Sequence, residues 1–408
     1  MYYAACSGKL DIMRLLLEAG VDPNTAASYG ETALCIAACC GQLDIVRLLL
    51  GAGVDPNVAE TKTGNTPLMM AAYSGTEAAL NIMRLLLEAA AKPNVADMYS
   101  GETPLMIAVK KGEEAAVRML LSHGANANAA NSCGQTSLYY AARSVQLDIM
   151  RLLLEVAAKP NVANTDSGET PLMMAALRGS EAAMITHLLK HGADPNLVDC
   201  NKRTPLAIIG SQAELRRYNM RAALVASVVQ AATALLQTCE SAGVLLQVNT
   251  RDSRGNTPLH SFCTAMLACE DDVYARQREG CVQIVHALLF NHGAHVDVVN
   301  ALGETPYKLW RRIYPTRFRG IVESNDEIHG RMSAQYHSLK CHCARLIVRH
   351  SIAYENRLPS SLIEFVILES KSESLYSEAK TETETKENGL EAGLDAKTGL
   401  KTYNTGTR

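Results

Sequence analysis

Residues 101–128, GETPLMIAVKKGEEAAVRMLLSHGANAN, show the pattern of apolar and polar positions on which most of the chain is built. Apolar residues recur with helical spacing in two short stretches, which predicts two helices separated by a turn. Thr103 and Pro104 suit the start of the first helix, because proline is tolerated where the amide has no intrahelical partner. Gly112 and Gly124 suit the two helix ends. Helices this short cannot bury their apolar faces on each other alone, so the unit needs neighbours.

The same unit recurs along the chain. Its G-x-T-P-L start, or a close variant, is found at Gly30, Gly64, Gly101, Gly134, Gly168, Lys202, Gly255 and Gly303. The unit at Gly64 carries about three extra residues, which we expect in the turn between its helices near residues 76–80. From Thr204 the pattern loosens, with a long helical stretch at 222–236 and an insertion at 267–280. Met1 aligns inside a unit, so we expect either a fragment or an unusual start whose first helix lacks a proper cap.

A T-P-L-H-x-A pattern at a period near 33 residues is the ankyrin signature, and the chain resembles the ankyrin-repeat superfamily. The resemblance implies an all-α fold, a solenoid of about eight to nine units with finger loops along one concave face. We expect regular repeats over residues 1–200, then irregular repeats and a capping unit with Trp310 over 201–313. A basic linker (314–337), a small helical box (338–369) and a disordered tail (370–408) are expected to follow. The histidine of the signature is retained only at His260.

Composition agrees with small-residue helix packing, since 48% of the 408 residues are hydrophobic but only 5% are aromatic. The formal charge of −3 does not indicate bulk attraction to nucleic acid, so we expect no nucleic-acid partner. No apolar run long enough for a membrane span and no secretory signal are found, which predicts a cytoplasmic or nuclear protein without a membrane partner.

The chain lacks the motifs of a catalyst. No P-loop, H-E-x-x-H or G-x-S-x-G pattern is present, so we expect a non-catalytic protein without a cofactor. Its 12 cysteines include no C-x-x-C pair, and reduced thiols in a helical core are the favoured interpretation. A metal held by Cys341, His342 and Cys343 is a minor alternative, because no second ligand pair lies at zinc-finger spacing.

Residues 338–369, SLKCHCARLIVRHSIAYENRLPSSLIEFVILE, predict two helices and a turn. Ser338 suits an N-cap, and Leu339, Cys343 and Ile347 form one stripe at i, i+4 and i+8. After Leu358 and Pro359, a second apolar face follows at Leu362, Phe365 and Val366. A terminal helical pair that caps the solenoid is one interpretation of this pattern.

The same stretch resembles the elongin-binding box of SOCS-box and VHL-box proteins, and most closely the C-terminus of the Fem family of ankyrin receptors. The resemblance implies that Leu339, Cys343 and Ile347 contact elongin C. It further implies a cullin-selecting segment at Leu358, Pro359, Leu362, Phe365 and Val366. A single L-P in place of the longer L-P-x-P favours a VHL-type over a SOCS-type cullin. The Fem resemblance is incomplete, because this chain lacks most of the helical-repeat region between that family's two ankyrin blocks.

The ankyrin resemblance also implies where a partner binds, on the finger loops and the exposed ends of the first helices. By position within the repeat, the candidate substrate-binding residues are Tyr29, Glu31, Tyr73, Tyr99, Glu102, Lys110, Lys111, Arg143, Glu169 and Arg178. Tyrosine anchors with charges of both signs suit an extended peptide segment. The recurring Glu31, Glu102 and Glu169 predict an acidic ridge beside a basic row.

These patterns together favour a substrate-recognition subunit of an elongin–cullin–RING ubiquitin ligase. Its expected partners are elongins B and C, a cullin and a protein substrate with an exposed peptide segment. The alternative of a different class is a plain ankyrin scaffold for protein–protein interaction.

Overall fold

The computed structural model describes residues 1–27, 30–178, 182–215, 222–268 and 275–310. In chain order its helices are α1 (Tyr2–Cys6), α2 (Leu10–Glu18), α3 (Ala33–Cys39), α4 (Leu43–Gly51), α5 (Pro67–Ser74), α6 (Glu77–Glu88), α7 (Pro104–Lys111), α8 (Glu114–Ser122), α9 (Ser137–Arg143), α10 (Leu147–Glu155), α11 (Pro171–Arg178), α12 (Ala182–Lys190), α13 (Pro205–Leu215), α14 (Ala222–Ala242), α15 (Pro258–Ala268) and α16 (Ala275–Phe290). Within these ranges no helix is long and apolar enough to span a membrane. Its compact units are Met1–Ala294 and His295–Arg408.

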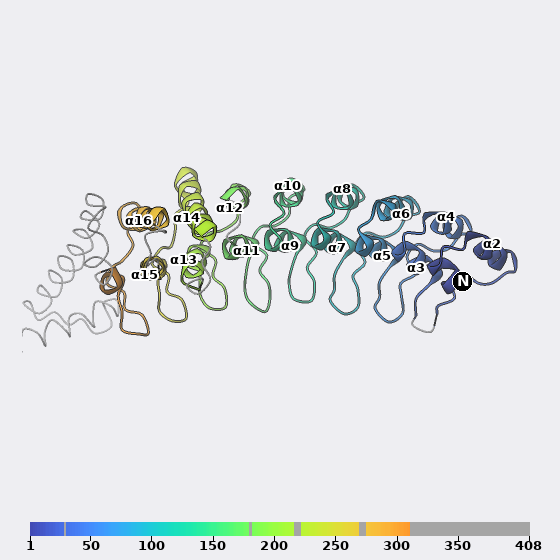
Figure 1. Cartoon of the computed structure of the whole chain (residues 1–408), viewed down its shortest axis with the longest axis horizontal. Helices are drawn as coiled ribbons and strands as arrows, with labels where there is room; N and C mark the ends of the chain where they lie inside the picture. The colour runs from blue at the N-terminus through green and yellow to red at the C-terminus, as the bar shows by residue number, and fades with distance from the viewer. Residues whose placement is uncertain (28–29, 179–181, 216–221, 269–274, 311–408) are drawn as a thin grey trace, which may run out of the picture. The chain divides into compact units, whose positions relative to one another are not determined.

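The first compact unit consists of helix pairs stacked side by side in two layers (Figure 1). The odd-numbered helices α1 to α15 pack on one another as an inner layer, and the even-numbered helices α2 to α16 form an outer layer. Long loops, which we call fingers, leave the outer helices and return to the next inner helix (Figure 1). The described residues of this unit thus show the all-helical solenoid of stacked helix pairs that the 33-residue period predicts.

The T-P-L motif begins the inner helices as the sequence predicts. In α7, Thr103 takes the N-cap position and its hydroxyl accepts a hydrogen bond from the Met106 amide, while Pro104 occupies the first turn. Gly112 ends the helix at a φ of 79°, in the left-handed region that other residues adopt with strain. The start of α15 differs in the unit that retains the T-P-L-H histidine. There the Thr257 amide and hydroxyl both lie at hydrogen-bond distance from His260 Nδ1. At the other end of the chain, α1 has no side-chain cap, as expected.

The core lies between the two helix layers. The leucine of each T-P-L motif is almost fully buried, at Leu68, Leu105, Leu138, Leu172, Leu206 and Leu259. Outer helices contribute Leu49, Leu86, Leu120, Leu153 and Leu188 from equivalent positions. Each such side chain contributes roughly 1.5–3 kcal/mol by leaving water. Because every unit buries its leucines against both neighbours, the array is held together by repeated nearest-neighbour packing.

The extra residues of the Gly64 unit are helical, which corrects the expectation of a longer turn. Helix α6 has 12 residues where α4 and α8 have 9. Thr76 caps its first turn by accepting a hydrogen bond from the Ala79 amide. The insertion therefore extends the outer helix by almost one turn, because a threonine cap lies where the added residues begin.

The irregular units also differ in helix length. Helix α14 contains the predicted stretch 222–236 and continues to Ala242. Helices α15 and α16 extend into both sides of the predicted 267–280 insertion, whose residues 269–274 lie outside the described ranges. In the second compact unit, residues 306–310 are helical and follow a turn at Gly303, and Trp310 is buried.

Candidate functional site

The finger face consists of the fingers and the adjoining ends of the inner helices, where the sequence places the candidate substrate-binding residues. In the first compact unit, each finger contacts the next through a backbone hydrogen bond. In each bond an amide donates to a carbonyl oxygen of the preceding finger: Thr61 to Gly30, Met98 to Thr63, Ser132 to Ser100, Thr165 to Cys133, Cys200 to Ser167, and Ser253 to Asn201. The fingers are therefore positioned by their neighbours and present side chains at fixed intervals.

In six fingers an Asp or Asn side chain, which the sequence analysis missed, binds backbone amides of the same finger. Asp97 is buried and accepts hydrogen bonds from the amides of Tyr99, Ser100 and Glu102. Asn131, Asn164, Asp199, Asp252 and Asn300 accept equivalent amides in their own fingers. An Asp or Asn three or four residues before the finger glycine was the available signal, because such side chains satisfy turn amides.

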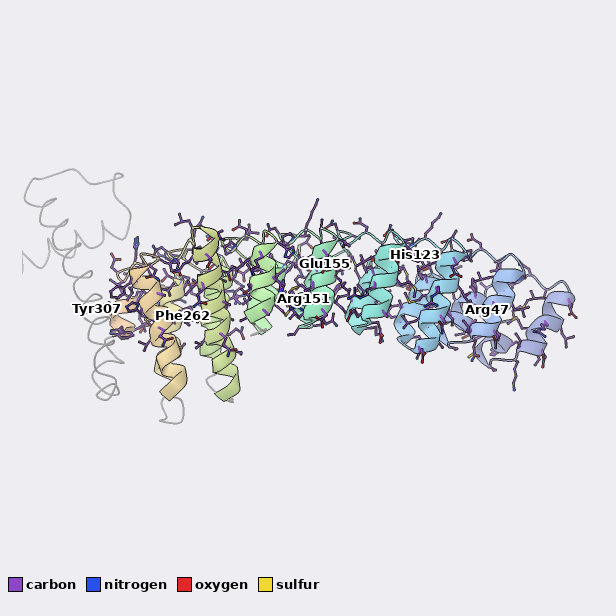
Figure 2. All side chains as sticks on the ribbon, turned by 90° about the horizontal axis from the view of Figure 1, so that it is seen from above. Arg47, His123, Arg151, Glu155, Phe262 and Tyr307 are labelled. Carbon is purple, nitrogen blue, oxygen red and sulfur yellow. The ribbon has the colours of Figure 1, made fainter. Side chains whose placement is uncertain are left out.

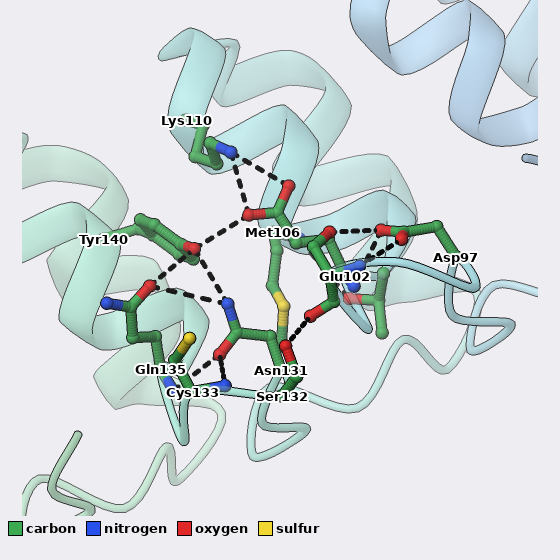
Figure 3. A network of polar contacts seen from close by, with 11 residues as sticks. Asp97, Glu102, Met106, Lys110, Asn131, Ser132, Cys133, Gln135 and Tyr140 are labelled. Atoms are coloured by element: carbon green, nitrogen blue, oxygen red, sulfur yellow. Dashed lines mark hydrogen bonds and ion pairs between the residues drawn. The ribbon is translucent and has the colours of Figure 1, made fainter. Parts of the chain in front are cut away.

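Glu102 is the centre of a polar network on the finger face (Figure 3). The residue is 5% exposed, and its carboxylate accepts from Lys110 Nζ at 2.8 and 2.9 Å and from the Tyr140 hydroxyl at 2.8 Å. Tyr140 also contacts Asn131 and Gln135 of the next finger. The network thus connects two neighbouring units through α7, α9 and two fingers.

This geometry corrects the predicted acidic ridge. Glu102 does not lie on the surface beside the basic row, because its carboxylate is buried against Lys110 of that row. Glu31 and Glu169 are only partly exposed. Glu169 accepts from the Ser167 hydroxyl at 3.0 Å and from Tyr139 at 3.4 Å. The carboxylates at this repeat position therefore bond within the array, and their role in binding a partner stays a prediction.

Tyrosine hydroxyls beside these carboxylates stay protonated. Burial, followed by the hydrogen bond to Glu102 and its charge, raises the pKa of Tyr140 well above its usual range. The pKa of Tyr2 rises to about 12, chiefly through a hydrogen bond to Glu31 and then through burial. A protonated phenol beside a carboxylate acts as a hydrogen-bond donor, not as a base.

Other candidate residues are accessible. Lys111 and Arg143, at the ends of α7 and α9, are exposed and have no ion pair within the described part of the chain. Tyr99 is 75% exposed at a finger tip, next to Met98 at 72%. Tyr73 is partly buried, and its pKa is raised by burial and then by the charges of Glu102 and Asp97. Two cations and an apolar finger tip are therefore available to a partner.

Several predicted site residues lie outside the described residues. These are Tyr29, the side chain of Arg178, and the elongin and cullin contacts Leu339, Cys343, Ile347, Leu358, Pro359, Leu362, Phe365 and Val366.

The thiols inside the array are poor nucleophiles. Burial is the largest cause that raises the pKa of Cys35 and of Cys239 to about 11, and it moves the pKa of Cys263 in the same direction. Since the thiolate is the reactive form, these cysteines act as core residues. What the finger face offers is hydrogen bonding, charge and apolar contact, and the fold and this site define a helical-repeat protein that binds partners non-covalently.

Comparison with known families gives this class a name. The family description "Ankyrin repeats (3 copies)" matches residues 1–97 and 81–164, and "Ankyrin repeat" matches residues 167–200 and 254–301. The matches together cover more than half of the chain, which belongs to the ankyrin-repeat family.

Two curated relatives are similar to part of the chain. Ankyrin repeat and SOCS box protein 16 of Homo sapiens is 33% identical over 194 residues, which are 47% of this chain and 36% of that protein. Protein fem-1 homolog CG6966 of Drosophila melanogaster is 32% identical over 120 residues, which are 29% of this chain and 14% of that protein. The chain thus spans little more than a third of the first relative and far less of the second.

Among solved structures, the ankyrin repeat domain of Bcl-3 is 27% identical, with a TM-score of 0.45 over 50% of this chain and 91% of that one. The human ASB11 ankyrin repeat domain is 26% identical, with a TM-score of 0.44 over 51% of this chain and 90% of that one.

Proposed function

We propose that this protein is a substrate-recognition subunit of an elongin–cullin–RING ubiquitin ligase. The observation that carries the proposal is the order of two features along one chain. An ankyrin array with an accessible finger face comes first, and the L-x-x-x-C-x-x-x-I pattern of residues 339–347 follows. Relatives whose names contain "SOCS box" and "fem-1" support it.

In this proposal the C-terminal box connects the chain to the ligase. Leu339, Cys343 and Ile347 dock elongin C, with the leucine in an apolar pocket and the small cysteine allowing close approach. The segment 358–366 selects the cullin, with a VHL-type cullin favoured over a SOCS-type one. The chain then contributes proximity between substrate and ubiquitin-charged enzyme, and the chemistry belongs to its partners.

The finger face holds the substrate in this proposal. Lys111 and Arg143 are two of its exposed cations, whereas Lys110 is engaged by Glu102. Tyr99 and Met98 add an exposed apolar anchor on a neighbouring finger. An extended segment that carries acidic and apolar side chains fits this combination.

One experiment tests the ligase assignment directly. The full chain is co-purified with elongins B and C and compared with a Leu339→Asp, Cys343→Asp variant. We expect a stable complex with the wild-type chain and none with the variant. If the wild-type chain binds no elongin, the proposal fails and the alternative, an ankyrin scaffold outside any ligase, takes its place.

A second experiment tests the finger face separately. Proteins retained by the wild-type chain are compared with those retained by a Lys111→Glu, Arg143→Glu variant. Arg47→Glu is the control, because Arg47 is also an exposed cation but lies on the outer helix α4. Loss of the substrate only with the finger-face variant supports the placement, and equal retention by all three proteins contradicts it.

A further inference from the structure

The first helix pair, α1 and α2, has an open side. Helix α1 packs on α3 and α2 packs on α4, and α2 ends the row of outer helices, beyond Arg47 of α4 (Figure 1 and Figure 2). In this pair Tyr3 is 84% exposed, Ile12 49% and Leu15 64%. Large apolar side chains that are exposed together on one surface are typical of a site for a partner protein.

The chain contains an internal reference for α2. Helix α10 has the same nine residues, LDIMRLLLE, but packs between α8 and α12. The counterparts of Ile12 and Leu15 in α10 are Ile149 and Leu152, which are 3% and 8% exposed. Because the two helices have identical sequences, the exposure of Ile12 and Leu15 results from the missing neighbour.

The same holds for α1. Its Tyr3 has the position that Tyr140 has in α9. Tyr140 is 5% exposed and donates to Glu102 of the preceding unit, so this position faces the preceding unit. In α1 that direction leads out of the array. Tyr3, Ile12 and Leu15 thus belong to a stacking face that lacks a neighbour in the described part of the chain.

We propose that a second copy of the chain covers this stacking face, so that two chains form a dimer through α1 and α2. A two-fold axis in the contact plane and perpendicular to the helices places each α2 antiparallel to the α2 of the other copy. The same axis places α1 antiparallel to α1. Inner helices then meet inner helices and outer helices meet outer helices, so the two layers continue across the contact.

One register of the two α2 helices suits both the apolar and the charged side chains. With the axis between Met13 and Arg14, Ile12 of each copy lies opposite Leu15 of the other. Asp11 and Arg14 are three residues apart and lie on the same flank of this contact. In the chosen register Asp11 of one copy is offset from Arg14 of the other by about 3 Å along the helix, which an arginine side chain spans.

The charges of α2 favour a copy of the same chain as the occupant. Asp11 and Arg14 are exposed, and neither forms an ion pair among the described residues. In α10 the counterparts Asp148 and Arg151 contact one another at 3.3 Å. A face with one acid and one base in this arrangement complements itself, because the two-fold axis pairs each acid with a base twice.

The contact is small, so the dimer should be weak. A standard interface uses about 20–30 residues from each side, whereas the first helix pair extends over residues 2–18. We therefore expect dissociation at about micromolar concentrations. Each dimer presents two finger faces, so a partner with two binding segments would be held more tightly by the dimer than by the monomer.

Sedimentation velocity of the full chain at about 1 to 200 μM tests the self-association. The wild-type chain should change from monomer to dimer over this range. Leu15→Asp should stay monomeric, because it places a charge within the apolar contact. Leu245→Asp is the matched control, since Leu245 is 86% exposed in the loop after α14, and this variant should dimerise like the wild type.

A charge exchange tests the antiparallel register. Asp11→Arg has two bases on the flank and Arg14→Asp has two acids, so each variant alone should dimerise about tenfold more weakly than the wild type. Mixed in equal amounts, the two variants should form a heterodimer of nearly wild-type affinity, because every acid then faces a base. A fluorescent label on one variant reports the heterodimer in the sedimentation experiment.

The proposal is overturned if the wild-type chain stays monomeric at the highest concentration. It is equally overturned if Leu15→Asp dimerises as readily as Leu245→Asp, which would place the contact elsewhere. Mixed charge variants that associate no more tightly than each variant alone overturn the antiparallel register. Far-UV circular dichroism shows whether each variant is folded, and if Leu15→Asp is not, Leu15→Ser takes its place with the same expected loss of the dimer.

Discussion

Burial of the Glu102 carboxylate predicts a large difference between two ion pairs of similar length. Glu102 meets Lys110 at 2.8 Å and Glu114 meets Arg118 at 2.7 Å. The Glu102 side chain is 6% exposed, whereas that of Glu114 is 43% exposed. We compare the neutral, nearly isosteric substitutions Glu102→Gln and Glu114→Gln in the full chain.

The expected magnitudes follow from what each carboxylate contacts. Lys110 is 44% exposed, so its pairing with Glu102 is screened by water and contributes only about 0.5–1 kcal/mol. The charge-assisted hydrogen bond from Tyr140 to the Glu102 carboxylate adds about 1 kcal/mol. In the Glu102→Gln variant, an amide NH₂ group that faces Lys110 adds a further small cost. Glu102→Gln should therefore lower the free energy of unfolding by about 2 kcal/mol. Glu114→Gln should lower it by about 0.5 kcal/mol, because its pair is exposed.

Urea unfolding followed by far-UV circular dichroism measures both differences at pH 7. A cycle that adds Tyr140→Phe isolates the contact between Glu102 and Tyr140, for which we expect a coupling of about 1 kcal/mol. Equal losses of stability for the two Gln variants would refute the argument from burial. A coupling energy near zero would show that the hydroxyl contributes nothing through Glu102.

Three further changes have predicted outcomes. Gly64→Ala should destabilise the fold more than Gly53→Ala in thermal unfolding. Both glycines have a positive φ, but only at Gly64 would an added Cβ lie 2.4 Å from Met98 Cγ. Equal decreases in melting temperature would contradict this prediction. Asn128→Ala should cost about 1–2 kcal/mol in urea unfolding, since its side chain bonds Ala157 O and the Lys159 amide of the next unit; a loss below about 0.3 kcal/mol would contradict it. Burial raises the pKa of Asp97, but hydrogen bonds from Ser100, Glu102 and Tyr99 outweigh it and hold the pKa low. Its contribution is therefore present above about pH 4 and lost as pH falls through the lowered value, so Asp97→Asn should flatten the acid limb of the stability–pH curve; an unchanged limb would contradict it.

The sequence predicted the helix pairs, and the start and end of α7, because those depend on local chemistry. The Thr103 cap, the Pro104 start and the Gly112 end are all readable from one unit, and the structure confirms each of them. The position of the Glu102 side chain was not readable in this way. It depends on Lys110 one helix length away and on Tyr140 in the following unit, and repeat position alone places Glu102 on an exposed ridge.

The candidate site shows the same division. Lys111, Arg143 and Tyr99 are accessible, as their repeat positions suggest. Asp97 and Asn131, whose side chains bind the finger amides, were not predicted. They lie before the repeated G-x-T-P-L motif, and the residue at this position varies between Asp and Asn. Likewise, the cap at Thr76 explains why the added residues lengthen α6. The number of residues alone does not distinguish a longer helix from a longer turn.

The fingers have a mechanical consequence as well. Two lines of hydrogen bonds join successive units, one between finger tips and one near the finger bases, where Asn57, Asn94, Asn128, Asn161 and Asn196 each bridge to the next loop. A hinge motion between two units about either line must stretch the other. The array in the first compact unit should therefore resist bending, with small strains distributed over many units. A partner that contacts several fingers then binds a surface on which the spacing between fingers is fixed before binding.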